Sequence, residues 1–190
     1  MTILLLGANG QVGWELQRTL SVLGELVTAE RMPGADIALD TSDLTRVQAA
    51  LDTVAPDMIV NASAYTAVDK AEEETELATR LNAELPGLIG TWAARHGARV
   101  LHYSTDYVFD GGKDAPYVET DPTGPINVYG RTKLAGDEAL LASGCAALIL
   151  RVSWVYGMRG QNFLLTMRRL MDERDRLTIV DDQIGAPTWC

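Results

Sequence analysis

The chain has 190 residues, of which 47% are hydrophobic and 22% charged, and it carries a formal net charge of −10. This length and composition exclude an intrinsically disordered chain and predict one main globular domain. The negative charge argues against non-specific binding to nucleic acid or to an anionic membrane surface. The chain has no membrane-length apolar run, no signal-peptide pattern and no disulfide spacing between its two cysteines. We therefore expect a cytoplasmic protein with neither a nucleic-acid nor a membrane partner.

Predicted strands and helices alternate along the chain. The apolar run Thr2–Gly7 predicts a buried strand, and the apolar spacing that starts at Val12 predicts a helix. A second helix begins near Ser42, with Ser42 or Asp43 as its N-cap. The other predicted elements are strands at Glu25–Glu30, Asp36–Leu39, Asp57–Ala64, Ala98–Thr105, Ala146–Ser153 and Leu177–Val180, a loop at Asp110–Pro125, and helices at about Thr75–Arg95, around Tyr129 and at Asn162–Glu173. This alternation predicts an α/β fold with a parallel sheet covered by helices on both faces.

Three glycines mark the junction between the first strand and the first helix. In "GANGQVG", Gly7, Gly10 and Gly13 suit a tight turn, the close approach of a pyrophosphate and close helix–strand packing. The free N–H groups at the start of the helix would hold the phosphate charge. The spacing is G-x-x-G-x-x-G rather than the commoner G-x-G-x-x-G, and a plain strand–turn–helix is the alternative. The position after the first strand favours nucleotide binding.

The end of the second predicted strand bears on the choice of cofactor. Glu30 stands where an acid can bind the ribose hydroxyls of NAD, and Arg31 beside it could take the 2′-phosphate of NADP. A solvated turn explains both residues equally well. The sequence therefore leaves NADH and NADPH open.

Tyr129 and Lys133 lie four residues apart on a predicted helix, so they share one face. Hydride attack on a ketone builds negative charge on its oxygen, which a phenol can relieve by giving a proton. A nearby ammonium would lower the phenol pKa from its ordinary value of about 10. Thr105 ends a predicted strand, where open α/β sheets bind ligands, and its hydroxyl can orient the carbonyl. A surface lysine and a strand-end hydrogen bonder are the plainer alternatives.

Seven strings in chain order carry a family resemblance: "GANGQVGWELQ", "NASAYTAVDKAE", "HYSTDYVFDG", "NVYGRTKLAGD", "RVSWVYG", "NF" and "DQIGAPT". With them the chain resembles the extended short-chain dehydrogenase/reductase superfamily and, more narrowly, the dTDP-4-dehydrorhamnose reductase family. One departure is Asp137, where Glu is usual in the family. The resemblance implies a Rossmann-type doubly wound sheet. It also implies NAD(P)H-dependent reduction of the 4-keto group of a dTDP-deoxysugar, in the synthesis of dTDP-L-rhamnose for cell-wall polysaccharide.

The resemblance also implies a division of the chain. Residues 1–153 would form the NAD(P)-binding domain with the catalytic residues. Residues 154–190 would begin a small substrate-binding region that is mostly absent from this chain, which would make the chain a truncated form.

Residue roles follow from the same resemblance, position by position. The cofactor would contact Gly7, Gly10, Gln11 and Val12 at its pyrophosphate, Asp40 and Thr41 at its adenine, and Ala64, Tyr65, Thr66 and Tyr103 on its nicotinamide side, with Tyr129 and Lys133. The catalytic residues would be Thr105, Tyr129 and Lys133. The sugar nucleotide would contact Val68, Thr105, Asp106, Tyr129 and Trp154.

Two other functions remain open on the same scaffold: a sugar-nucleotide epimerase, and a non-catalytic dinucleotide-binding regulatory subunit like that of methionine adenosyltransferase. Similar 4,6-dehydratases carry Thr-Asp-Glu at the strand end, whereas Tyr107 takes the third place here, which favours reduction over elimination. Family members often form homodimers, some with Mg²⁺ at the interface. Glu15 matches one such ligand position, but the others would lie beyond Cys190, so we predict no metal site.

Two polar features are expected to be structural. His102 lies inside an apolar strand and is predicted to be a core histidine with its hydrogen bonds satisfied. The acidic run Asp69–Glu76 is predicted to be the solvated start of a helix.

Overall fold

A computed structural model describes all 190 residues and has a six-stranded parallel sheet in the order β3-β2-β1-β4-β5-β6. The strands are β1 (Thr2–Leu6), β2 (Glu25–Glu30), β3 (Ile37–Ala38), β4 (Met58–Asn61), β5 (Arg99–Thr105) and β6 (Ala146–Val152). The strand order reverses direction between β1 and β4, as in a doubly wound Rossmann-type sheet. The predicted fold class is confirmed.

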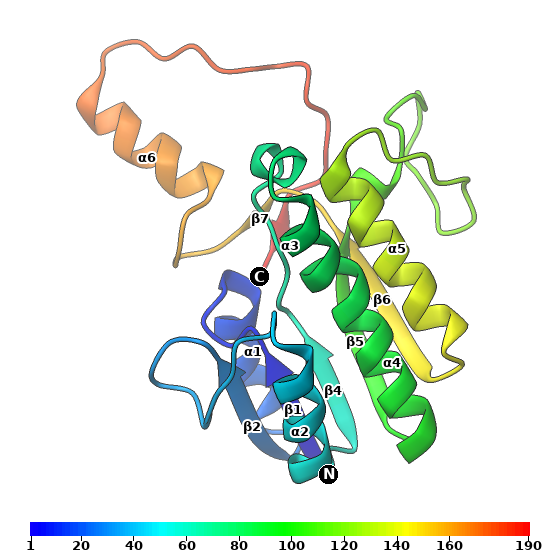
Figure 1. Ribbon diagram of the computed structural model, residues 1–190. Coiled ribbons are helices and arrows are strands. Elements are labelled where there is room, and N and C mark those ends of the chain that lie inside the picture. The colour runs from blue at the N-terminus through cyan, green and yellow to red at the C-terminus, as the bar shows by residue number, and fades with distance from the viewer.

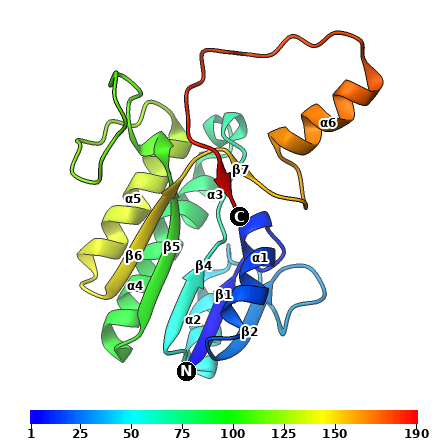
Figure 2. The same cartoon turned by 180° about the vertical axis from the view of Figure 1, so that it is seen from behind.

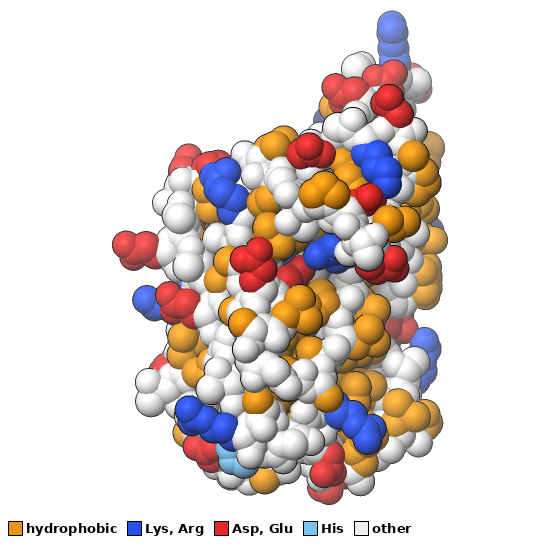
Figure 3. Space-filling model, turned by 90° about the vertical axis from the view of Figure 1, so that its right-hand side faces the viewer, with side chains coloured by type: hydrophobic (Ala, Val, Ile, Leu, Met, Phe, Trp, Pro, Cys, Tyr) orange, Lys and Arg blue, Asp and Glu red, His pale blue; other side chains and the backbone are white.

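Helices cover the two faces of the sheet unequally. One face carries α2 (Leu44–Val54), α4 (Leu85–His96) and α5 (Val128–Ala142), and the other carries α1 (Gln11–Leu20) over β1 and β2 (Figures 1 and 2). Behind β5 and β6 no helix covers the second face, and Leu148 of β6 is 59% exposed. Figure 3 views the side of the molecule that holds α5 and the edge strand β6, where hydrophobic side chains lie scattered among charged ones.

The core forms on both sides of β1 because this strand is apolar at every position from Ile3 to Leu6. Successive side chains of a strand point to opposite faces. Leu4 and Leu6 pack in the cluster beneath α2 and α4, while Ile3 and Leu5 pack in the cluster beneath α1, and all four are fully buried. Burial of each such side chain stabilises the fold by about 1.5–3 kcal/mol. This pins the glycine loop that follows β1 to the centre of the sheet.

The long predicted helix at Thr75–Arg95 is interrupted by a wide turn. The structure has α3 (Thr75–Thr79), a π-helical turn at Arg80–Glu84 and then α4. Pro86 stands at the start of α4 and has no N–H for a regular helical bond, so a turn of altered spacing fits here. Farther back, Asp43 caps α2 by accepting a bond from the Arg46 N–H at 3.1 Å, as predicted.

The last part of the chain differs from the prediction. The short β7 (Val155–Tyr156) pairs in parallel with β8 (Thr188–Trp189), and α6 (Phe163–Glu173) stands apart from the sheet with no buried residue (Figure 1). The predicted strand at Leu177–Val180 is wrong, since residues 174–187 form neither helix nor strand. Its composition suits a strand, but no neighbouring strand pairs with it. None of the helices is both long and apolar enough to cross a membrane.

Candidate functional site

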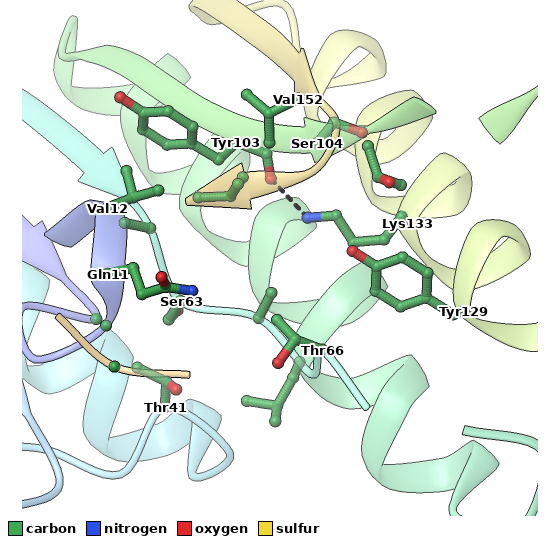
Figure 4. Close-up of a pocket in the computed structure, with 18 of the residues that line it drawn as sticks. Gln11, Val12, Thr41, Ser63, Thr66, Tyr103, Ser104, Tyr129, Lys133 and Val152 are labelled. Atoms are coloured by element: carbon green, nitrogen blue, oxygen red, sulfur yellow. Dashed lines mark hydrogen bonds between the residues drawn. The ribbon is translucent and has the colours of Figure 1, made fainter. Parts of the chain in front are cut away.

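A cavity of about 680 Å³ opens at the carboxyl ends of the strands, where the sheet order reverses. This volume is in the range of small-molecule sites. The predicted site residues that line it are Gly7, Gly10, Gln11, Val12, Glu30, Arg31, Asp40, Thr41, Ala64, Thr66, Val68, Tyr103, Thr105, Asp106, Tyr129, Lys133 and Trp154. Figure 4 shows Gln11 and Val12 across the cavity from Tyr129 and Lys133. The fold thus brings together residues that are more than 140 positions apart in the chain.

Tyr65 is the predicted cofactor residue that does not line the cavity. Its hydroxyl donates to Glu74 at 2.8 Å, and its N–H donates to the buried Asn82 side chain at 2.9 Å. These bonds hold the ring among buried side chains behind the cavity wall. The acidic run is correspondingly more than a solvated helix start, because Glu74 holds Tyr65 and Glu72 accepts the N–H of Val128 at 2.8 Å. Glu72 thereby fixes the start of α5.

The glycine loop leaves room for a phosphate group. Gly7 adopts a φ of +80°, which favours glycine, and a side chain on Gly13 would overlap the Gly7 carbonyl. Gly10 precedes α1, and no side chain caps the first N–H groups of this helix. A Cβ on Gly10 would meet only Gly7 O, at 3.4 Å, so this part of the loop is open. The residues present therefore fit a dinucleotide with its pyrophosphate at the start of α1.

At the end of β2, both oxygens of Glu30 are engaged. Its carboxylate accepts from the Arg31 N–H at 2.7 Å and from the Asn9 N–H at 3.4 Å. The side chain of Arg31 is exposed beside it on the cavity wall. Asp40 is half-buried, and hydrogen bonds from the Ser42 hydroxyl and N–H hold its pKa below the usual range. Of these side chains, Arg31 is the one free to meet an anionic group.

Close packing sets the position of α5. Asn127 caps the helix by accepting the Gly130 N–H at 2.7 Å. A side chain on Gly130 would overlap the Tyr107 carbonyl, and one on Gly136 would overlap the Asn82 carbonyl in the π-helical turn. The two glycines therefore let α5 approach the end of β5 on one side and the π-helical turn on the other. This brings Tyr129 and Lys133 to the cavity.

Lys133 is buried, with 1% of its surface exposed, so it is not a surface lysine. Its amine donates to the Tyr103 carbonyl at 2.6 Å, the bond drawn in Figure 4, and lies 3.4 Å from Nε2 of His102. Burial lowers the pKa of Lys133 to about 8, and the Asp137 carboxylate opposes that shift. His102 is buried and also bonded to Asn61, as predicted for a satisfied core histidine.

The structure corrects the expected effect of Lys133 on Tyr129. Burial raises the pKa of the Tyr129 phenol, and the Thr105 hydroxyl lowers it by less. The Lys133 amine is directed at the Tyr103 carbonyl, and the net shift of the phenol pKa is upward. A phenol with a raised pKa remains protonated at neutral pH, which is the form that can give a proton.

Thr105 is positioned at the strand end by its own short turn. Its hydroxyl accepts the N–H of Tyr107 at 3.2 Å and lies 3.2 Å from Oδ1 of Asp106, to which it donates. The residue is almost fully buried, at 4% exposure. Its oxygen therefore has a defined position beside the Tyr129 phenol.

Further residues on the cavity wall were not predicted, among them Asn9, Ser63, Leu81, Ser104, Val152 and Gly160. Ser63 lies just beyond the end of β4, so the strand-end rule could have found it. Gly160 has no such signal. It reaches the cavity because Asn162 donates to the Gln11 side chain at 2.8 Å and Gln11 donates to the Gln161 carbonyl at 3.2 Å. Trp154 has a φ of +45° and its ring packs edge-on against Phe163.

Glu15, which matches a metal-ligand position of the family, forms an ion pair. Glu15 pairs with Arg18 at 2.8 Å on α1. No three His, Cys, Asp or Glu side chains are grouped as metal ligands.

Comparisons with known proteins show which family the chain belongs to. A family model described as the RmlD substrate binding domain matches residues 1–190. Two curated relatives named dTDP-4-dehydrorhamnose reductase, from Burkholderia thailandensis and Escherichia coli K12, are 49% and 51% identical over 100% and 99% of this chain. The chain spans 62% of the length of each relative.

A solved structure shows the same fold. The dTDP-4-dehydrorhamnose reductase of Bacillus anthracis, crystallised in complex with NADP, superposes with a TM-score of 0.91 at 36% identity, over 99% of this chain and 66% of that one. From the match of the family model to every residue and the identity over the whole length, the chain belongs to the RmlD family, the family of the dTDP-4-dehydrorhamnose reductases.

Proposed function

We propose that the protein reduces the 4-keto group of dTDP-4-dehydro-L-rhamnose to give dTDP-L-rhamnose, with NADPH as the reductant. One observation carries this proposal: Thr105, Tyr129 and Lys133 share a cavity with an uncapped glycine loop. In this proposal residues 1–153 bind the dinucleotide and hold the catalytic residues, and residues 154–190 contribute to the substrate side. Family membership and the names of the relatives support the substrate class.

The bound dinucleotide would supply a hydride to the carbonyl carbon. The residues of this chain do the rest. The Thr105 hydroxyl orients the ketone oxygen, and the protonated phenol of Tyr129 gives that oxygen a proton as its charge develops. Burial of Tyr129 and Thr105 keeps water from competing for the same positions.

Lys133 acts on the phenolate that remains after this proton transfer. The amine of Lys133 and the hydroxyl of Tyr129 both face the cavity from α5 (Figure 4). A positive charge there favours the phenolate by Coulomb attraction. Burial raises the phenol pKa and outweighs this attraction in the resting site, so Tyr129 stays protonated until it gives its proton.

The substrate side of the proposal rests on residues at the mouth of the cavity. Val68, Asp106 and Trp154 line it on the side of the catalytic residues. Trp154 also borders a second, apolar hollow between α6 and the segment before β8. We propose that these residues contact the sugar nucleotide, with the exposed indole ring of Trp154 offering a flat apolar surface.

We propose NADPH rather than NADH because Glu30 is engaged by backbone N–H groups whereas Arg31 is exposed. Arg31→Ala is expected to weaken NADPH binding by about fivefold, or about 1 kcal/mol, and to leave NADH binding unchanged, because only NADPH has the 2′-phosphate. Fluorescence titration with both cofactors measures this. Arg95→Ala, at the last turn of α4, is the matched control. An equal loss for both cofactors would remove Arg31 from phosphate recognition.

The proposed function is tested by cofactor binding and by turnover. NADPH binding is measured on the 190-residue chain. Turnover is followed as the loss of NADPH absorbance with the ketosugar, on this chain and on a chimera that adds the remaining length of the Escherichia coli relative, since the chain spans 62% of that protein. Consumption of NADPH with formation of dTDP-L-rhamnose is the expected result. Binding without consumption in both forms would favour a regulatory subunit, and conversion of the sugar nucleotide into an epimer without net consumption of NADPH would favour an epimerase.

A further inference from the structure

A buried polar cluster lies behind Lys133, on the side away from the cavity mouth. It joins β5 to α5 through His102 and Asp137, each 1% exposed, as Lys133 is. Asp137 accepts the Ser104 hydroxyl at 2.7 Å through Oδ2 and lies 3.7 Å from Nε of Arg151. The proposed reaction assigns no role to His102 or Asp137.

Asn61 determines which nitrogen of His102 carries the proton. The N–H and the hydroxyl of Ser63 donate to Oδ1 of Asn61 at 3.2 and 2.8 Å. The NH₂ group of Asn61 therefore faces Nδ1 of His102, at 3.1 Å, and donates to it. Because Nδ1 accepts, the proton of a neutral ring must lie on Nε2. Burial and, secondarily, the charge of Lys133 hold the pKa of His102 well below its usual range, so the ring is neutral.

Nε2 of His102 has two neighbours. The Lys133 amine is 3.4 Å away and Oδ1 of Asp137 is 3.8 Å away. An ammonium has only donors and cannot accept the Nε2–H, whereas an uncharged amine can. Oδ1 of Asp137 is the buried side-chain oxygen that has no hydrogen-bond partner. The preferred acceptor of the His102 proton thus depends on the charge of Lys133.

Asp137 is the acidic side chain whose charge acts most directly on Lys133. The titratable and charged groups around Lys133 are His102 and Tyr103 on β5, Tyr129 and Asp137 on α5, Arg151 on β6, and Asp106 and Tyr107 in the turn after β5. Burial disfavours the ammonium and lowers the pKa of Lys133. The negative charge of Asp137 raises this pKa and so opposes the effect of burial. Loss of this carboxylate would leave a buried ammonium without a counter-charge.

We propose that Asp137 and His102 are positioning residues that keep Lys133 charged and directed at the Tyr103 carbonyl. While Lys133 is an ammonium, the nearest acceptor for the Nε2–H of His102 is Oδ1 of Asp137, 3.8 Å away. When Lys133 loses its proton, its lone pair accepts that N–H instead. The cluster therefore holds the lysine in place in both states. The expected effect on catalysis rests on the proposed reductase function. The expected tautomer of His102 and the expected titration of Lys133 do not depend on it.

The ring tautomer is tested on the wild-type chain by ¹⁵N NMR. The chain has two histidines, so the signals are assigned with His96→Gln. His102 is expected to carry its proton on Nε2. His96 provides the contrast, because its Nδ1 faces the Trp92 carbonyl at 2.8 Å and must be the protonated nitrogen there. A proton on Nδ1 of His102 would overturn the proposal.

The lysine charge is tested by titrating the side-chain NMR signals of the three lysines. Lys133 is expected to titrate near its lowered pKa of about 8. Asp137→Asn is expected to shift this titration down by about one pH unit, because a nearby opposite charge is lost. Asp137→Glu keeps the charge and is expected to restore it, while Lys70 and Lys113 serve as internal controls in each variant. An unshifted Lys133 in the folded Asp137→Asn variant would overturn the proposal.

The link to catalysis is tested by the pH profile of ketosugar reduction. Activity that needs the ammonium is present below the Lys133 pKa and is lost as the pH rises through it. Asp137→Asn is expected to move this alkaline limb to lower pH by the same shift that NMR reports, and Asp137→Glu to restore it. A lower rate with an unmoved limb would show a merely structural role for Asp137 and overturn the proposal. If the wild-type protein reduces no ketosugar, the proposed function fails, and the two NMR tests still decide the positions of the protons.

Discussion

Replacing Tyr129 with phenylalanine is expected to lower turnover of the ketosugar by about 10²–10⁴-fold, the usual contribution of a positioned proton donor. NADPH affinity is expected to stay at the wild-type value. The substitution removes only the hydroxyl, and the ring keeps its edge-on contact with Tyr107 at 5.5 Å between ring centroids. We expect binding to be carried mainly by the glycine loop and the end of β2, which line the same cavity as Tyr129. Fluorescence titration of NADPH and steady-state turnover, measured on the same preparation, separate the two effects.

Tyr117→Phe is the matched control for this experiment. Its phenol bonds Asp110 at 2.8 Å in the loop before α5, and the residue does not line the cavity. Its removal is expected to leave turnover unchanged. Wild-type turnover in Tyr129→Phe would remove Tyr129 from proton transfer, and equal losses in both variants would point to a general effect on folding.

Gly10→Val is expected to weaken NADPH binding by at least about tenfold, or about 1.4 kcal/mol, while the fold survives. The valine side chain would stand where a pyrophosphate must approach the backbone at the start of α1. The nearest atom to a Cβ at this position is Gly7 O at 3.4 Å, an ordinary contact, so the protein itself can accept it. The dissociation constant and the thermal unfolding midpoint are measured together. Unchanged affinity would show that the loop is only a turn.

Gly13→Ala gives the opposite pattern and tests the same loop independently. A methyl group at this position would overlap the Gly7 carbonyl, so the first turn of α1 must move away from β1. We expect this overpacking to destabilise the protein by about 1–3 kcal/mol, with the loss of binding following from the loss of structure. A stable Gly13→Ala protein would contradict the close helix–strand packing of the loop.

The sequence by itself determined the order of the six strands of the main sheet and of the helices between them, and it predicted the place of the site. The apolar run Thr2–Gly7 could only be a buried strand, and parallel strands joined by helices have few arrangements. Residues at the carboxyl ends of such strands meet at one edge of the sheet, so this rule placed Gly10 and Thr105 beside one another, and the family resemblance placed Tyr129 with them. These features depend on local pattern and on general rules of chain connection, which one sequence contains.

Only the tertiary structure decided the burial and the hydrogen-bond partners of each side chain. The sequence predicts Lys133 as a site residue on a helix, but only the close approach of α5 buries it, and the direction of its pKa shift follows from that burial. Tyr65 turns away from the cavity because Glu74 and Asn82, well separated from it in the chain, take its polar groups. The strand predicted at Leu177–Val180 does not form. Its composition favours a strand, but a strand needs a neighbouring strand to pair with, and none lies beside it. Burial, hydrogen-bond partners and pairing are all relations between distant segments, and no local pattern encodes them.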